Sequence, residues 1–202
     1  DRYAVCIGSE IKSDSTLTVT TSIDQRLKCD NLEMLNRDGW HLINSKQHFN
    51  SEELRFFHDN TGYIVFGKND VIADAGKRTG QWNTHMKMYK PADVSGDVIS
   101  LHIDHGAHPS GGSYHYVVLP AATKESVEKF DLNAEIKVLR NDALAQAIQV
   151  PLVDNGCWIT SYTDQPFEID GKPFAPDAPG VYYAELNQGK WDKKQSAPFK
   201  ID

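Results

Sequence analysis

The chain has 202 residues, of which 40% are hydrophobic and 24% are charged. This composition is typical of folded globular proteins and excludes an intrinsically disordered chain. The formal net charge of −7 argues against a nucleic-acid binder, because neutralising phosphates requires a basic face, and any anionic partner would have to meet a local cluster of Lys and Arg.

Strand signals recur through the first half of the chain. Thr16–Ile23 alternates apolar and hydroxyl side chains, which is the two-residue period of a half-buried strand. Tyr63–Phe66 follows the turn-forming run Asp59–Gly62, and we expect Gly67–Asp70 to close this strand. Further short strands are predicted at Tyr3–Ile7, Trp40–Ile43 and Phe56–His58.

The second half continues this pattern. Val98–Ile103 and Tyr114–Leu119 indicate two long strands, joined by a turn at Pro109–Ser113 where Pro, Gly and Ser cluster. Asn141–Ile148 has a helical composition, but Ala alternates there with Leu, Gln and Ile, so we interpret it as a strand. Later strands are predicted at Cys157–Tyr162 and Gly180–Leu186.

Helical signals are sparse. One short helix is predicted at Thr123–Phe130, with Thr123 as its N-cap and Ser126 where a capping box would have Glu. Many short strands separated by Gly, Pro, Asn and Asp predict an all-β fold, a large antiparallel β-sandwich. Because no repeat, linker or low-complexity run interrupts the chain, we expect a single domain over residues 1–202.

The cysteines do not suggest a metal site or a redox pair. Cys6, Cys29 and Cys157 lie far apart and lack CxxC spacing, so we expect mostly free thiols, with one disulfide as the alternative. No stretch approaches the length of a membrane span, and no signal-peptide pattern opens the chain.

Several runs together resemble one family of enzymes. They are Ala4–Ser13, Val19–Arg26, Thr61-Gly62-Tyr63, Arg78-Thr79-Gly80-Gln81-Trp82, Ile103–Gly106 with Pro109, Tyr114–Pro120 and, more faintly, Leu139–Asp142 with Gln146-Ala147. In order and spacing they are similar to the central β-sandwich domain of polysaccharide lyase family 8, which includes chondroitin AC and ABC lyases, hyaluronate lyases and xanthan lyases. Residues from about 151 to 202 resemble the family more loosely.

This resemblance implies a galactose-mutarotase-like super-sandwich that packs, in a full enzyme, against an N-terminal α/α toroid. The implied reaction is β-elimination on a uronic-acid-containing glycan of the chondroitin or hyaluronan type. A base removes the C5 proton, the bond to the 4-oxygen breaks, and the uronate carboxylate is neutralised so that the carbanion-like state is tolerated. An acidic polysaccharide and the toroid are the implied partners, no cofactor is implied, and the implied location is secreted or periplasmic.

The resemblance assigns no catalytic residue to this chain. In the family these roles belong to Asn, His, Tyr and Arg of the helical domain, joined by a Glu from an Asn- and Glu-rich segment early in the sandwich. The most similar segment of this chain, Asp30–Asn36, follows the matched opening strand instead of preceding it. The catalytic role of that Glu is therefore not transferred to Glu33. We therefore expect a scaffold that lines one wall of a polysaccharide cleft, with a free-standing carbohydrate-binding module as the alternative.

The run Asp104-His105-Gly106 suggests a metal-binding site, because His102 and His108 lie close to it in the sequence. In a strand, however, His102 and Asp104 share one face while His105 points to the other, so three ligands would need a bulge. We interpret Asp104, His105 and Gly106 as a structural corner fixed by hydrogen bonds. Sugar contact and metal binding are the alternatives.

Arg78, Trp82, Asn83 and His85 are the candidate substrate-binding residues. An indole face can stack on a sugar ring, and a guanidinium offers a bidentate fork to carboxylate or sulfate. The alternative is structural: a core tryptophan, with Arg78 paired to a local acid such as Asp74.

Overall fold

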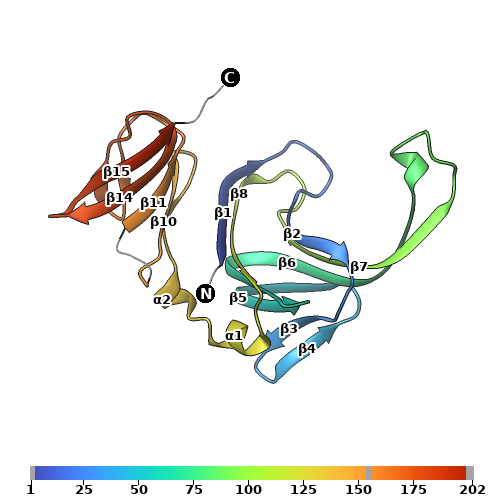
Figure 1. Cartoon of the computed structure of the whole chain (residues 1–202). Coiled ribbons are helices and arrows are strands. Elements are labelled where there is room, and N and C mark those ends of the chain that lie inside the picture. The colour runs from blue at the N-terminus through green and yellow to red at the C-terminus, as the bar shows by residue number, and fades with distance from the viewer. Residues whose placement is uncertain (1–2, 153–155, 199–202) are drawn as a thin grey trace. The chain divides into compact units, whose positions relative to one another are not determined.

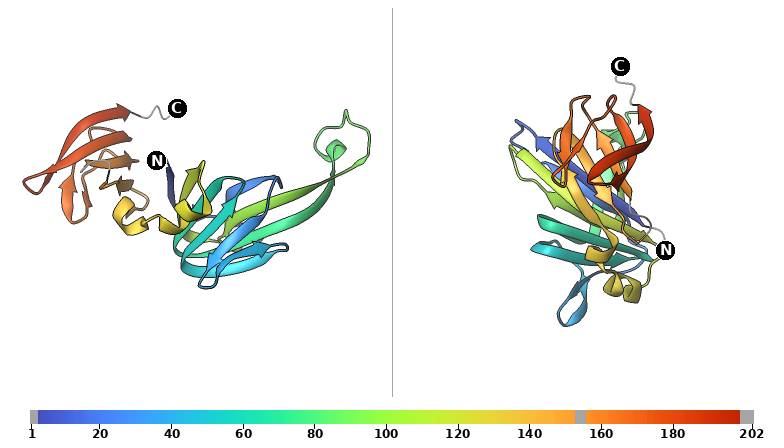
Figure 2. Two further views of the ribbon diagram at one scale, coloured as in Figure 1. Left: turned by 60° about the horizontal axis from the view of Figure 1, so that its bottom comes forward. Right: turned by 90° about the vertical axis from the view of Figure 1, so that its left-hand side faces the viewer.

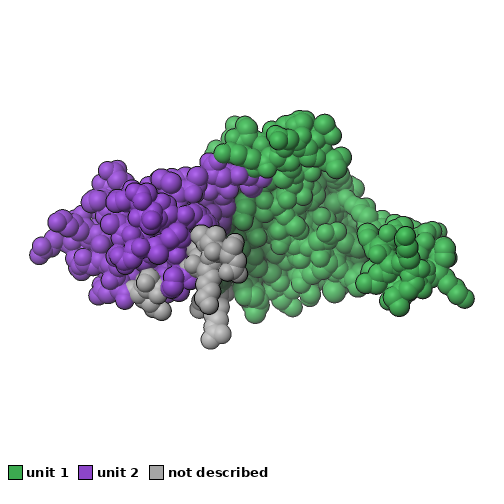
Figure 3. All heavy atoms as spheres, turned by 90° about the horizontal axis from the view of Figure 1, so that it is seen from above, with its two compact units in different colours: residues 1–6, 12–110, 114–128 green, residues 7–11, 111–113, 129–202 purple. Residues whose placement is uncertain are grey.

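The computed structural model describes residues 3–152 and 156–198. The chain divides into two compact units, shown in different colours in Figure 3. Unit 1 comprises residues 1–6, 12–110 and 114–128, and unit 2 comprises residues 7–11, 111–113 and 129–202. Antiparallel sheets dominate both, so the all-β prediction is confirmed. The single domain expected over residues 1–202 stays a prediction.

The strands of the larger sheet are β1 (Ala4–Lys12), β2 (Thr20–Leu27), β3 (Leu32–Asn36), β4 (Gly39–Ile43), β5 (Gln47–His58), β6 (Thr61–Gln81), β7 (Asp93–Asp104) and β8 (Ser110–Pro120). Their order is β1-β8-β6-β5-β3-β4, and β7 pairs with both β6 and β2 (Figure 1).

Strand β6 organises this sheet because it changes partner along its length. One edge pairs with β5, while the other pairs first with β8, up to Val65, and then with β7 from Asp70 onwards. Between these two stretches Gly67 has a φ of +72°, a left-handed conformation that suits glycine. The prediction that Gly67–Asp70 ends the strand is therefore wrong, because this run is a kink inside β6.

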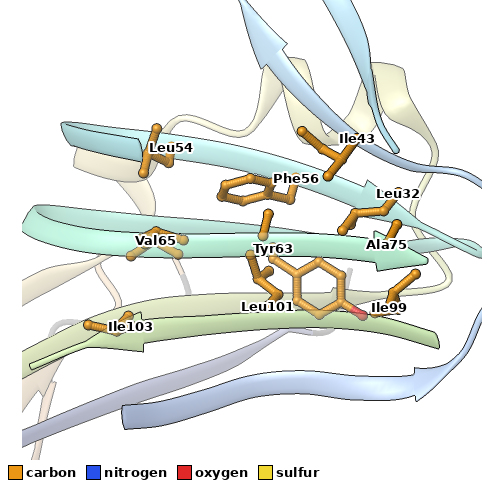
Figure 4. Close-up of a cluster of buried hydrophobic side chains, with 12 residues drawn as sticks. Leu32, Ile43, Leu54, Phe56, Tyr63, Val65, Ala75, Ile99, Leu101 and Ile103 are labelled. Carbon is orange, nitrogen blue, oxygen red and sulfur yellow. The ribbon is translucent and has the colours of Figure 1, made fainter. Parts of the chain in front are cut away.

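The core of unit 1 lies on one face of the curved sheet. Alternate residues of β6 and β7, including Tyr63, Ala75, Ile99 and Leu101, point into it and meet Phe56 of β5 (Figure 4). Its buried members are Leu32, Ile43, Leu54, Phe56, Tyr63, Val65, Val71, Ala73, Ala75, Ile99, Leu101 and Ile103. The apolar residues that alternate with polar ones in these strand sequences are thus the residues that form the core.

Unit 2 has its own sheet and its own core. The sheet comprises β9 (Lys137–Asn141), β10 (Ala145–Gln149), β11 (Gly156–Ser161), β14 (Gly180–Asn187) and β15 (Lys190–Pro198), in the order β15-β14-β11-β10-β9. A separate hairpin joins β12 (Phe167–Ile169) to β13 (Lys172–Phe174). Inward residues such as Ala147, Ile159 and Tyr182 form the core. The strand interpretation of Asn141–Ile148 is confirmed by β9 and β10.

Two short helices connect these parts of the chain, α1 (Lys124–Lys129) and α2 (Leu132–Glu135). Thr123 caps α1 as predicted, since its Oγ1 accepts from the Ser126 N–H at 3.1 Å. Ser126 completes a reciprocal box, because its Oγ accepts from the Thr123 N–H at 2.9 Å. The added helix α2 begins at Asp131, whose Oδ1 accepts from the Ala134 N–H.

Two boundaries differ from the sequence prediction. β2 begins at Thr20, four residues after the predicted start, because Ser13 and Ser15 bind the backbone N–H groups of Ser15 and Leu17 in a loop. The predicted turn at Pro109–Ser113 is also displaced. β8 already begins at Ser110, and the left-handed residues Gly106 and His108 turn the chain earlier.

All three cysteines are free thiols, and burial raises the pKa of Cys157 to about 12. Among the described residues, no helix has the length and apolar character needed to cross a membrane.

Candidate functional site

The end of the β6–β7 hairpin forms an arm, residues 77–97, with a distinctive surface. β2 stops at Leu27, opposite Val98, and the Lys28 N–H still donates to the Asp97 carbonyl at 2.8 Å. Beyond this bond the described arm strands pair only with each other, up to Gln81–Asp93. The arm ends in η1 (Trp82–Thr84) and projects beyond the sheet (Figures 1 and 2). None of its side chains is buried.

A hollow of about 480 Å³ lies where the arm meets β2. It is lined by Gln25, Arg78, Thr79, Gly80, Gln81, Trp82, His85, Val94 and Val98. Three of the four predicted substrate-binding residues, Arg78, Trp82 and His85, therefore line one cavity. Asn83 does not line it. Its Oδ1 is buried and has no hydrogen-bond partner within the described ranges.

Trp82 is 59% exposed, so it is not the core residue that the structural alternative expected. Its position explains this, since the strand ends at Gln81 and Trp82 begins the turn at the tip of the arm. An indole that stays in solvent beside a hollow is available to a flat ligand.

Arg78 pairs with Asp74, four residues earlier on the same face of β6, as the structural alternative proposed. The contact uses one of the five guanidinium N–H donors, and the Arg78 side chain remains 56% exposed. Asp74 is only 13% exposed, so the pair holds the guanidinium in place beside the hollow. Both an acid partner and a ligand can therefore be bound at once.

The sequence did not predict the other side of this hollow. Val94 and Val98 lie opposite Gly80 and Gly76 in the β6–β7 register, and Gln25 comes from the neighbouring β2. Only strand register brings these residues to Arg78 and Trp82. The one signal in the sequence was the two-residue alternation around Val98, which fixes its face but not its neighbours.

The Asp104-His105-Gly106 corner is held by several hydrogen bonds. Asp104 Oδ1 accepts from the Gly106 N–H at 2.7 Å, and Gly106 has a φ of +73°. The His105 N–H donates to the Val19 carbonyl at 2.9 Å, and His105 Nε2 lies 2.8 Å from Thr21 Oγ1. Burial lowers the pKa of His105 and also that of His102, so both rings are neutral near pH 7.

A second hollow of about 390 Å³ adjoins this corner. Its lining is His48, Phe49, Asn50, Asp70, Val71, Asp104, His105 and Gly106. Within the described ranges, no three His, Cys, Asp or Glu side chains are grouped so that they could hold a metal ion. Glu33, the acid to which no catalytic role was transferred, pairs with Lys124 Nζ at 2.5 Å.

The chain was compared with known proteins. The family model of the polysaccharide lyase family 8 super-sandwich domain matches residues 1–131. Chondroitinase-AC of Pedobacter heparinus is 30% identical over 151 residues, covering 73% of this chain and 21% of that protein. A hyaluronate lyase of Thermasporomyces composti is 28% identical over 162 residues, covering 75% of this chain and 20% of that protein.

Solved structures agree. A structure of chondroitinase AC lyase in oligosaccharide complexes superposes with a TM-score of 0.80 at 26% identity, covering 95% of this chain and 28% of that one. Paenibacillus xanthan lyase, at 20% identity and a TM-score of 0.75, shares the fold. The chain spans about a fifth of the length of the curated relatives it matches. It belongs to polysaccharide lyase family 8, and residues 1–131 match the super-sandwich domain of that family.

Proposed function

We propose that this chain supplies a non-catalytic wall of a lyase cleft and binds an acidic polysaccharide through the hollow on the arm. One observation carries the proposal. The exposed side chains of Trp82 and Arg78 both line the same hollow of about 480 Å³. Two of the relatives named above are a chondroitinase and a hyaluronate lyase, and chondroitin and hyaluronan both alternate a uronate with a hexosamine.

The chemistry of the hollow fits such a polymer. The apolar face of a pyranose ring can lie on the indole, while the guanidinium can bind a uronate carboxylate through paired N–H donors. Gln25, Gln81 and Thr79 add amide and hydroxyl groups for sugar hydroxyls.

Local charge favours the same ligand. The arm, residues 77–97, contains four cationic residues, Lys77, Arg78, Lys87 and Lys90, against the two acids Asp93 and Asp97, although the whole chain carries a net charge of −7. The arm is thus the local basic cluster that an anionic partner requires. Charge on an exposed arm also speeds association with an anionic chain, and this effect weakens with salt.

The proposal leaves bond cleavage to other residues. We infer that the base, the acid and the groups that neutralise the uronate lie on an α/α-toroid partner domain, and that the chain acts with it where polysaccharide occurs, outside the cytoplasm. The family membership supports this division, since the matched region is the super-sandwich domain.

Calorimetric titration of the 202-residue chain with chondroitin or hyaluronan oligosaccharides tests the proposal. We expect Trp82→Ala and Arg78→Ala each to weaken binding by about tenfold or more, since each removes ~1–3 kcal/mol of stacking or charged hydrogen bonding. Trp158→Ala and Arg37→Ala are matched controls, because they remove an exposed Trp and an exposed Arg elsewhere. Equal losses in the controls, or no binding by the unaltered chain, would overturn the proposal.

A free-standing carbohydrate-binding module is the second candidate. One observation favours it: every residue that lines the arm hollow belongs to unit 1 of this chain. Adding the helical domain of a family 8 lyase in trans separates the two. A cleft wall should raise the cleavage rate of that domain, with the gain lost in Trp82→Ala, whereas a binding module should leave the rate unchanged.

A further inference from the structure

The two hollows lie on the same face of the same strands. Val71, Ile99 and Ile103 point into the core, so the residues next to them along each strand point to the opposite face. The outward set includes Asp70, opposite Asp104, and Arg78, opposite Gly96. Asp104 lines the corner hollow and Val98 lines the arm hollow, six residues apart along β7, which is about 20 Å of strand. An extended glycan could contact both.

We propose that the hollow at the Asp104 corner is a second sugar subsite that takes an uncharged, unsulfated hexosamine ring of the glycan held by the arm. This inference rests on the proposed function, because it needs the arm to hold the same chain. The ligand of the 390 Å³ hollow would then be one sugar ring, and the carboxylates of Asp70 and Asp104 would select a neutral ring over an anionic one.

The polar groups of the corner hollow suit hydroxyl donors. Asp104 uses Oδ1 to accept from the Gly106 N–H, and Asp70 uses Oδ1 to accept from Asn50 Nδ2. The second oxygen of each carboxylate has no protein hydrogen bond within the described ranges, and neither has Asn50 Oδ1. The lining residues of the hollow therefore offer three acceptors, which match the O–H and N–H donors of a neutral sugar.

The same groups reject an anion. A carboxylate or a sulfate placed here would approach two like charges, those of Asp70 and Asp104, and burial lowers the pKa of the nearby His105, so that its ring supplies no compensating cation near pH 7. The arm hollow has the opposite character, because Arg78 lines it and the arm carries an excess of positive charge. A polymer that alternates charged and uncharged rings satisfies both hollows, with a uronate at the arm and a neutral hexosamine at the corner.

Binding of unsulfated chondroitin and of chondroitin sulfate, as oligosaccharides of equal length, tests this directly by calorimetry. We expect the unaltered chain to bind the unsulfated oligosaccharide about tenfold or more tightly, and we expect this ratio to fall several-fold in Asp70→Asn. Asparagine keeps an acceptor but removes the charge. Asp164→Asn, which makes the same charge change at an exposed site in unit 2, should leave the ratio as it was.

A second variant guards against misfolding of the first. Asn50→Ala should weaken binding of a decasaccharide by several-fold and leave binding of a disaccharide, which reaches the arm alone, unchanged. Two results together would rule out the subsite in a chain whose binding still depends on Trp82. Asp70→Asn would leave the ratio of the affinities for the two polymers unchanged, and Asn50→Ala would leave the binding of both the disaccharide and the decasaccharide unchanged. If the unaltered chain binds neither polymer, the proposed function fails and this inference fails with it.

Discussion

At the scale of single residues, His58 is the most unusual side chain of unit 1. It is fully buried at the end of β5, and its two ring nitrogens have no partner in the described part of the chain. Arg26 donates through Nη2 to the His58 carbonyl at 3.1 Å and through Nη2 to Tyr63 Oη, also at 3.1 Å. Burial, followed by the positive charge of Arg26, lowers the pKa of His58, while Asp24, Asp59 and Asp30 oppose this. The ring is therefore neutral in the folded state.

This predicts acid sensitivity of the fold. Because the pKa of His58 is lower in the folded chain than its ordinary value of 6.5, the unfolded chain binds the proton first. The free energy of unfolding should fall as the pH drops below 6.5, by at most about 1.4 kcal/mol per pH unit for this proton. In His58→Leu the difference in urea stability between pH 7.5 and pH 5.5 should shrink. Exposed His41→Leu is the control, and an equal difference in both variants would refute the role of His58.

At the scale of elements, α1 is fixed closely on β6. Gly62 lies in β6, and a Cβ there would come within 2.3 Å of Val127 Cγ2 on the helix. Arg55 Nη1 donates to the carbonyls of Val127 and Glu128 at the C-terminal end of α1, where a cation is favourable. The Thr61-Gly62-Tyr63 run of the family resemblance is thus a site of close helix–strand packing, directly after the turn at Asp59 and Asn60.

Gly62→Ala should therefore destabilise the chain by about 1–3 kcal/mol, the usual cost of overpacking a core. Gly76→Ala is a matched control in the same strand, because its Cβ would meet nothing within 4 Å. We expect the control to be neutral or slightly stabilising, since alanine restricts the unfolded chain. Urea unfolding measures both. If Gly62→Ala unfolds at the same urea concentration as Gly76→Ala, α1 is not packed on β6 as described.

Sequence could predict the elements wherever alternation reflects burial. Val98–Ile103 and Tyr114–Leu119 are examples, since alternate side chains there face the core of unit 1 or pack against it. The second half of β6 escaped prediction for two reasons. Residues 71–75 follow the Gly67–Asp70 run, which we interpreted as the end of the strand, and residues 77–81 bury no side chain and so show no alternation of burial. β15 escaped for the related reason that Lys190–Pro198 is polar and held by pairing with β14.

The part of the candidate site that lies in one stretch of sequence could be predicted, and the rest could not. Arg78, Trp82 and His85 stand within eight residues of one another in the sequence, so their chemistry could be read together. Val94 and Gln25 could not be added, because strand register, not sequence distance, brings them to the hollow. For the same reason, the outward face that Asp104 shares with Arg78 appears only in the folded sheet.

At the scale of the whole molecule, we propose that glycan binding and bond cleavage belong to different domains. Units 1 and 2 each have a hydrophobic core, and the two hollows and the basic arm belong to unit 1. We therefore propose that this family 8 super-sandwich chain holds a glycan while a helical domain carries out the elimination.

The most direct test follows the absorbance of unsaturated uronate while the purified 202-residue chain is incubated with chondroitin or hyaluronan at a concentration that gives calorimetric binding. β-Elimination by this chain would create that chromophore. We expect the chain to release or absorb heat on binding the polysaccharide and to cause no rise in absorbance. A sustained rise that scales with the concentration of the chain would contradict it and place catalytic residues among these 202.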